Sequence, residues 1–269
     1  MEYKMDPLPE FDDGSNGNSK LHNKKCVITG GDSGIGRAVA IAFAKHGADV
    51  AIIYLKSEEK DAHFTAKYIE DKFKRKCITI ASDISKEDKC KSSIQKIIKE
   101  FTHIDVLVNN AAVQYPVKDI SKITSAKMIK TFSVNIFAMF WITKASLPYM
   151  KRGSSIINTS SVTAYRGSPE LLDYSATKGA IVSFTRSLSA NLMNKGIRVN
   201  GVAPGPVWTP LIPGSFTPKK VSEFGSDAPM KRPAQTEELA PAYVFLASED
   251  ASYMSGQFIH VNGGEIVNG

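Results

Sequence analysis

Thr29-Gly30-Gly31-Asp32-Ser33-Gly34-Ile35-Gly36 decides the fold of this chain, and it directly follows a short apolar run. The next eight residues, Arg37 to Ala44, form a helix-favouring run. Glycines between a strand and a helix let the backbone approach a phosphate closely, and the helix N-terminus offers free N–H groups and a partial positive charge. The stretch predicts a phosphate-binding strand, turn and helix. A turn that only connects the two elements is the alternative.

Outward from this turn, short apolar runs alternate with longer segments of helical period. One such segment places apolar residues three or four positions apart, at Ala62, Ala66, Ile69 and Phe73. This alternation is typical of a parallel sheet with helices on both faces. We therefore expect a single α/β domain of the Rossmann type, doubly wound, with a mainly parallel seven-stranded sheet. Its strands are predicted at residues 26–29, 50–54, 77–81, 104–108, 155–159, 197–202 and 257–261.

The first 23 residues differ in composition from the rest. They combine prolines and glycines with several Asn and Ser residues, which cannot supply a packed core. A length of 269 residues suits one large domain or two small ones. We expect residues 1–23 to form an N-terminal extension that is flexible or contacts another subunit, and residues 24–269 to form the one domain.

The net charge and the placement of the lysines indicate which classes of partner the chain could bind. The chain has 34 Lys and Arg residues against 27 Asp and Glu residues, a net charge of +7. Residues 1–23 hold five acids and two bases, so the remaining residues carry 32 bases and 22 acids, a net charge of +10. The lysines are scattered over several predicted helices without interleaved aromatic residues, so we expect no nucleic-acid partner. Binding of an anionic dinucleotide would account for part of this excess positive charge.

Apolar runs are too short for a membrane span. The longest one in a helical context, Ile136 to Ile142, has seven residues, where a span needs about 20. The N-terminal stretch is polar, so we expect a cytoplasmic protein with no membrane partner. The three cysteines and five histidines show no ligand spacing, so no metal site is predicted.

The glycine turn resembles the TGxxxGxG turn of the short-chain dehydrogenase/reductase family, and further segments match the family in order from residue 24 to 264. Ala112 stands where the family usually has glycine. The N-terminal extension and the turn resemble a bacterial branch described as general stress protein or glucose/ribitol dehydrogenase-like. The other matching segments are Asn109-Asn110-Ala111-Ala112, Val134-Asn135-Ile136-Phe137, Ser160-Ser161, Tyr174-Ser175-Ala176-Thr177-Lys178, Pro204-Gly205, Thr209 and Val261-Asn262-Gly263-Gly264.

Tyr174 and Lys178 are four residues apart, which places them on one face of a helix. A cation beside a tyrosine stabilises the phenolate, and an oxidised nicotinamide nearby adds further positive charge, so we expect a lowered pKa for Tyr174. The resemblance implies that Tyr174 is the general acid/base, that Ser161 hydrogen-bonds the substrate oxygen, and that Asn135 holds a water connecting Lys178 to solvent. Ser160 is the alternative to Ser161, which has the family's usual separation from Tyr174.

The resemblance also implies the residues that bind a nicotinamide cofactor. No acid follows the second strand before Glu58, and Lys56 with Ser57 could receive a 2′-phosphate, whereas Ser33 is not basic. This predicts NADP in preference to NAD. A helix cap is the alternative role for Asp83. The expected contacts are Gly30, Asp32, Ser33, Gly34, Ile35, Gly36, Tyr54, Lys56, Asp83, Ile84, Asn109, Ala111, Tyr174, Lys178, Pro204, Gly205, Val207 and Thr209.

The sequence therefore predicts an NAD(P)-dependent oxidoreductase that acts on an alcohol/carbonyl pair. The segment from Thr209 to Pro233, rich in Pro, Gly, Phe and Ser, is the expected lid over a small alcohol, aldehyde, ketone or sugar-like substrate. The alternative is a catalytically silent nucleotide-binding protein with a regulatory or scaffold role. The resemblance further implies a homotetramer.

Overall fold

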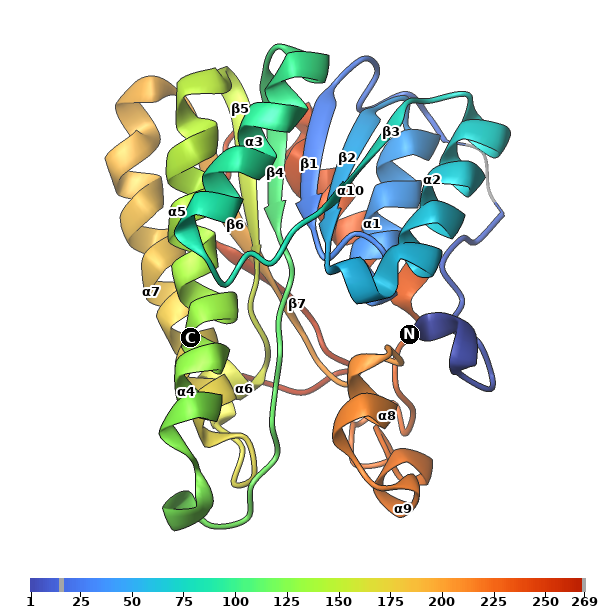
Figure 1. Cartoon of the computed structure of the whole chain (residues 1–269), viewed down its shortest axis with the longest axis vertical. Helices are drawn as coiled ribbons and strands as arrows, with labels where there is room; N and C mark the ends of the chain where they lie inside the picture. The colour runs from blue at the N-terminus through green and yellow to red at the C-terminus, as the bar shows by residue number, and fades with distance from the viewer. Residues whose placement is uncertain (15–16, 268–269) are drawn as a thin grey trace.

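A sheet of seven parallel strands forms the centre of the molecule (Figure 1). The computed structural model describes residues 1–14 and 17–267. The strand order is β3-β2-β1-β4-β5-β6-β7, and every neighbouring pair is parallel, where the sequence predicted a mainly parallel sheet. The strands are β1 (Lys25–Thr29), β2 (Asp49–Tyr54), β3 (Cys77–Ala81), β4 (Ile104–Asn109), β5 (Met150–Thr159), β6 (Arg198–Pro204) and β7 (Phe258–Val261).

Helices cover both faces of this sheet. Two separate apolar cores result, one between the sheet and α1, α2 and α10, the other between the sheet and α3, α5 and α7. The central strands are therefore buried on both sides, which explains their continuous apolar runs, whereas the edge strands β3 and β7 are mostly half-buried. The helices are α1 (Gly34–Lys45), α2 (Glu59–Phe73), α3 (Glu87–Phe101), α4 (Ser125–Phe132), α5 (Ala138–Ser146), α6 (Thr163–Arg166), α7 (Leu172–Leu192), α8 (Leu211–Ser215), α9 (Pro218–Ser222) and α10 (Ala240–Ala247).

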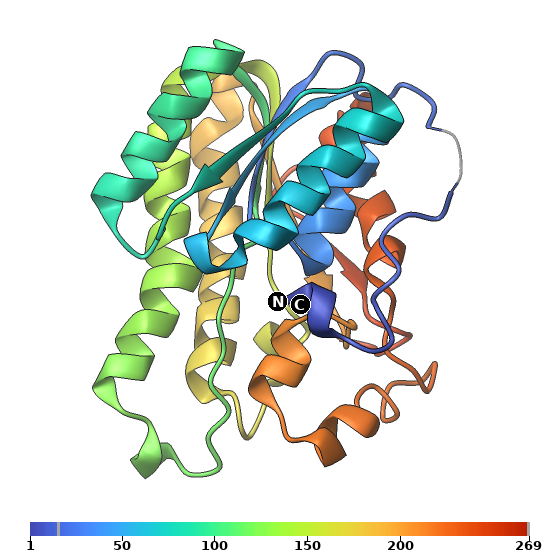
Figure 2. The same cartoon turned by 45° about the vertical axis from the view of Figure 1, so that its right-hand side comes forward.

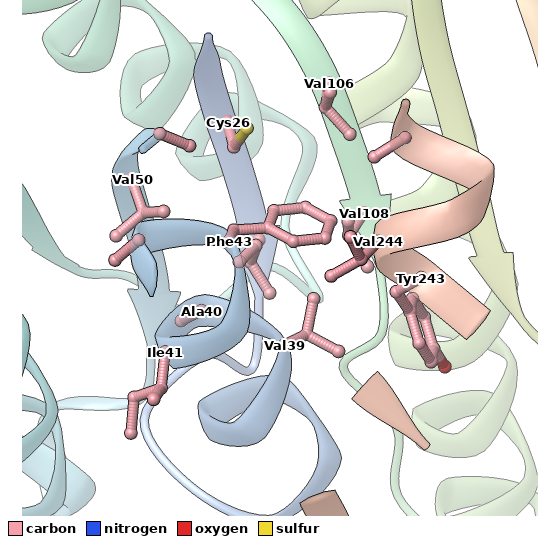
Figure 3. Packing of buried hydrophobic residues seen from close by; sticks show 14 of the residues in the cluster. Cys26, Val39, Ala40, Ile41, Phe43, Val50, Val106, Val108, Tyr243 and Val244 are labelled. Atoms are coloured by element: carbon pink, nitrogen blue, oxygen red, sulfur yellow. The ribbon is translucent and has the colours of Figure 1, made fainter. Parts of the chain in front are cut away.

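The first core fixes α1 against the sheet. Figure 3 shows Val39 and Phe43 of α1 packed among Val106 and Val108 of β4 and Tyr243 of α10. Phe43 and Tyr243 are fully buried. Because α1 follows β1 through the glycine turn, this packing holds the turn at the carboxyl ends of the strands.

The strand order reverses between β1 and β4. In open parallel sheets, ligands bind in the crevice outside the carboxyl ends of the strands at such a reversal. Here the segments after β1, β4, β5 and β6 all meet at that edge, and α8 and α9 lie beyond it (Figure 1). The fold therefore brings the predicted site segments to one place.

The N-terminal segment lies against its own chain. The Phe11 ring makes edge contacts with Phe64 and Tyr68 of α2, with ring centroids 5.9 and 5.4 Å apart. Asp12 accepts from Lys45, Lys72 and the Tyr68 hydroxyl. The expectation of a flexible or subunit-contacting extension did not include these contacts within the chain. In the described part of the chain, no helix has the length and apolar character to cross a membrane.

Candidate active site

The glycine turn approaches the start of α1 so closely that a side chain would not fit. A Cβ on Gly36 would lie 1.8 Å from the Gly30 carbonyl oxygen, and Gly30 has a φ of +64°. The Asn110 side-chain amide donates to the carbonyls of Thr29 and Gly30, each at 3.2 Å, and so joins the turn to the end of β4. Asn110 was quoted in a sequence match but was not among the predicted site residues.

The catalytic candidates Tyr174 and Lys178 share one face of α7. Lys178 is 2% exposed, and its Nζ donates to the Thr159 carbonyl at 2.8 Å and lies 5.3 Å from the centre of the Tyr174 ring. A buried ammonium with one backbone partner is costly unless a further negative or polar group joins it. The end of β5 and α7 therefore hold a cationic side chain beside a phenol.

Burial is the main cause of the pKa shifts of Tyr174 and Lys178. It raises the pKa of Tyr174 to about 12, although a hydrogen bond with Ser161 acts in the opposite direction. It lowers the pKa of Lys178 to about 7. The predicted lowering of the Tyr174 pKa is thus wrong for the protein by itself, because desolvation of the phenolate outweighs its neighbours.

The side chains of the two serines at the end of β5, Ser160 and Ser161, have different hydrogen-bond partners. Ser161 hydrogen-bonds Tyr174, and its Oγ accepts from the Thr163 amide at 3.2 Å. Ser160 Oγ instead donates to the Lys178 backbone carbonyl at 2.9 Å. Ser161 is therefore the serine that shares the surroundings of the phenol.

Asn135 lies in a π-helical turn, Ser133–Phe137, between α4 and α5. Its side chain accepts from the Val113 amide at 2.8 Å and donates to the Val113 carbonyl at 3.0 Å and to Thr177 Oγ1 at 3.1 Å. Such single π-turns are frequent at functional sites. Asn135 joins the segment after β4 to α7 next to Lys178.

The predicted adenosine residues line a surface cavity of about 440 Å³. Lys56 and Ser57 enter it from the end of β2, and Ser82 and Asp83 from the end of β3. Asp83 accepts from the Ser85 amide at 3.1 Å and from its hydroxyl at 2.7 Å. The Asp83 side chain therefore forms this local turn and an ion pair with Lys130 of α4 at 3.4 Å, and does not cap α3.

Three further predicted residues, Ile84, Asn109 and Ala111, meet Asn135 around a small hollow beside β1. Asn109 donates to Asn158 Oδ1 at 2.9 Å, while its own Oδ1 is buried without a hydrogen-bond partner among the described residues. A buried acceptor of this kind is rare and can serve a ligand.

The remaining predicted residues form the walls of the crevice. Thr209 faces the turn, since a Cβ on Gly34 would lie 3.3 Å from it, and Gly205 is pressed against the Asn262 backbone. Asp32, Tyr54, Pro204 and Val207 are buried, whereas Ser33 and Ile35 are partly buried. Val207 pairs with Ala234 in an isolated bridge at the base of the lid segment.

Comparison with known proteins gives consistent matches. The family model described as enoyl-(acyl carrier protein) reductase covers residues 30–265. An uncharacterized oxidoreductase of Bacillus subtilis, YhxC, is 58% identical over 100% of this chain and 93% of its own. Glucose and ribitol dehydrogenase of Daucus carota is 50% identical over 100% and 94%. A short chain dehydrogenase from Burkholderia cenocepacia solved with NADP superposes with a TM-score of 0.84 at 28% identity, covering 91% and 98%.

Replacing Lys178 by Met should stabilise the protein at low pH. Burial lowers the Lys178 pKa from 10.5 to about 7, so wild type loses stability as the pH falls through that interval, when the unfolded chain binds a proton that the folded one resists. The stability advantage of Lys178→Met should therefore grow from pH 9.5 to pH 7 and then level off. Urea unfolding at several pH values measures it.

The matched control is Lys195→Met, at an exposed lysine just after α7. Its stability difference from wild type should not follow pH over this range. A pH-independent difference for Lys178→Met would contradict the burial of a titrating ammonium.

Proposed function

The chain belongs to the short-chain dehydrogenase/reductase family and is an NAD(P)-dependent oxidoreductase, and from this premise we propose that Tyr174 is its general acid/base, assisted by Lys178, Ser161 and Asn135. The observation that supports this most is the buried Lys178 ammonium beside the Tyr174 ring, with Ser161 hydrogen-bonded to the phenol. Because all four side chains are present, an active enzyme is favoured over a silent nucleotide-binding scaffold.

The residues present fit a dinucleotide. Gly30 and Gly36 let the turn and the start of α1 approach each other without side chains between them, and the buried Asn109 Oδ1 offers an acceptor without a protein partner among the described residues. We propose that residues 30–36 hold the pyrophosphate, Lys56 and Asp83 the adenosine end, and Thr209 the nicotinamide side. When bound, the nicotinamide supplies hydride transfer.

The proton chemistry falls to the side chains of α7 and β5. During reduction, Tyr174 donates its proton to the developing alkoxide while Ser161 donates a hydrogen bond to the same oxygen. Lys178, fixed by the Thr159 carbonyl, stabilises the phenolate that remains. Asn135, hydrogen-bonded to Thr177, orients a water through which Lys178 exchanges its proton. Positive charge near Tyr174 in the complex offsets the desolvation that raises its pKa.

We propose NADP as the preferred cofactor and a polyol, sugar, aldehyde or ketone as the substrate. Support comes from the NADP complex of the structural neighbour and from the relative that is named for glucose and ribitol. Within this chain, support comes from Lys56, which lies at the cavity with no acid at the end of β2.

Tyr174→Phe should lower kcat by about a thousandfold, as expected when a general acid is lost, while NADPH still binds. Steady-state kinetics on a panel of sugars, aldehydes and ketones, with cofactor binding by calorimetry, measures both effects. Tyr149→Phe, at the opposite end of β5, is the control and should keep its activity. Full activity of Tyr174→Phe on every substrate found would contradict the mechanism.

Wild type should show a higher kcat/KM with NADPH than with NADH, and Lys56→Glu should reverse this order, because a carboxylate repels the 2′-phosphate and accepts from a 2′-hydroxyl. Lys67→Glu makes the same charge change on the exposed face of α2 and should leave the preference unchanged. A wild-type preference for NADH would overturn the cofactor assignment.

We also propose the homotetramer that the family resemblance implies, with an interface that includes α5 and α7. Phe137 and Phe140 are 43% and 51% exposed, and the Phe140 ring lies 4.3 Å from that of Phe184 on α7, centre to centre. Exposed aromatic clusters of this size favour a protein contact. Light scattering should give a tetramer for wild type and a smaller species for Phe140→Lys. A monomeric wild type would contradict the proposal.

A further inference from the structure

The helix that follows the phosphate-binding turn has no cap of its own. Ser33 occupies the N-cap position of α1 without a capping hydrogen bond from its side chain, and the first turn contains no acidic residue. That turn instead contains Arg37, a cation at the end of the helix where the dipole favours anions. The start of α1 therefore favours a negative group from outside the helix.

Glu2 supplies that group from the N-terminal segment. Its side chain is buried, with one carboxylate oxygen accepting from the Gly34 amide and the other from Arg37 Nη1. The Glu2 backbone amide donates to Asp61 Oδ2 at 3.1 Å, and Asp61 also pairs with Arg37. A residue outside the predicted domain thus caps α1 and balances its buried cation.

Arg37 carries this restraint into the turn itself. Its Nε donates to the Asp32 carbonyl at 2.9 Å and to Thr65 Oγ1 at 2.9 Å, and Thr65 donates to the same carbonyl at 3.0 Å. Asp32 lies in the middle of the turn. The guanidinium that pairs with Glu2 therefore also contacts the turn, together with Thr65 and Asp61.

The same segment also contacts the other wall of the crevice. The Trp208 indole donates to the Pro7 carbonyl at 2.9 Å, and Trp208 immediately precedes Thr209, which faces Gly34. Further along, the Glu10 carbonyl accepts from the Glu237 amide at 3.1 Å. Figure 2 shows the N-terminal turn between α1 and the segment that contains α8.

We propose that Glu2 is a positioning residue for cofactor binding. It holds the phosphate-binding turn in its binding geometry through the Gly34 amide and Arg37, so that the dinucleotide does not bear the cost of ordering the turn. The N-terminal segment is then a working part of the cofactor site. This inference rests on the proposed function and adds to it a residue that no sequence pattern identified.

Glu2→Gln tests the proposal because it keeps the shape of the side chain but removes its charge and presents a donor to Arg37. The dissociation constants of NADPH and NADH, measured by calorimetry, should both rise by about tenfold, the effect of losing a charged hydrogen bond. The kcat at saturating cofactor and the KM of the carbonyl substrate should stay near wild type. Glu2→Asp, which keeps the charge, should recover most of the affinity.

Asp6→Asn is the matched control, since Asp6 is an exposed acid in the same segment. Its cofactor affinity should equal that of wild type. Hydrogen exchange without nucleotide gives a second measurement: amides 33–37 should exchange faster in Glu2→Gln than in Asp6→Asn. Should Glu2→Gln fold too poorly for calorimetry, Glu2→Asp decides: because the charge is kept, its nucleotide affinity and the protection of amides 33–37 should stay near those of Asp6→Asn, and a tenfold weaker affinity or faster exchange at 33–37 would count against the proposal.

The outcomes distinguish a failure of the role proposed for Glu2 from a failure of the proposed function. Unchanged affinity in Glu2→Gln would mean that the cap only stabilises the fold, and tighter binding would mean that Glu2 competes with the cofactor phosphates; either overturns the proposal. If wild type binds neither nucleotide, the proposed function itself fails. If wild type binds but Glu2→Gln behaves as Asp6→Asn does, only the role of Glu2 fails.

Discussion

The close approach of α1 to the turn that precedes it is the constraint on which the rest of the structure depends. The Gly30 carbonyl lies where a Cβ on Gly36 would be, so the helix can start at the carboxyl end of β1 only because both residues are glycine. The packing of α1 on β4 and α10 then fixes the direction of the helix amides. A crevice edged by backbone N–H groups follows from these two conditions.

Two cationic side chains are buried around this crevice, although burial of a charge is unfavourable without a partner. Lys178 is buried with one backbone acceptor, and Arg37 is buried with Glu2 and Asp61. Removing one partner from such a group is costly, so each charge holds its neighbours in one arrangement. In the mechanism we propose, the first charge serves the proton chemistry of Tyr174, and in our further inference the second holds the turn that binds the cofactor.

Burial also sets the pKa values of Tyr174 and Lys178 in the chain without a cofactor. In the chain by itself, desolvation raises the pKa of Tyr174 to about 12 and lowers that of Lys178 to about 7. Neither value suits a proton transfer by the phenol near neutral pH. The mechanism we propose therefore needs positive charge close to Tyr174, from a protonated Lys178 and, in the oxidised form of the cofactor, from the nicotinamide.

The sequence alone predicted the succession of strands and helices along the chain, the glycine turn, and the placement of Tyr174 and Lys178 on one helix face. Each of these features depends on residues that are close in sequence. It did not reveal that β7 pairs in parallel with β6 at the edge of the sheet, that burial raises the pKa of Tyr174, or that Glu2 caps a helix 32 positions later. Those features depend on long-range packing and desolvation, which only the folded chain decides.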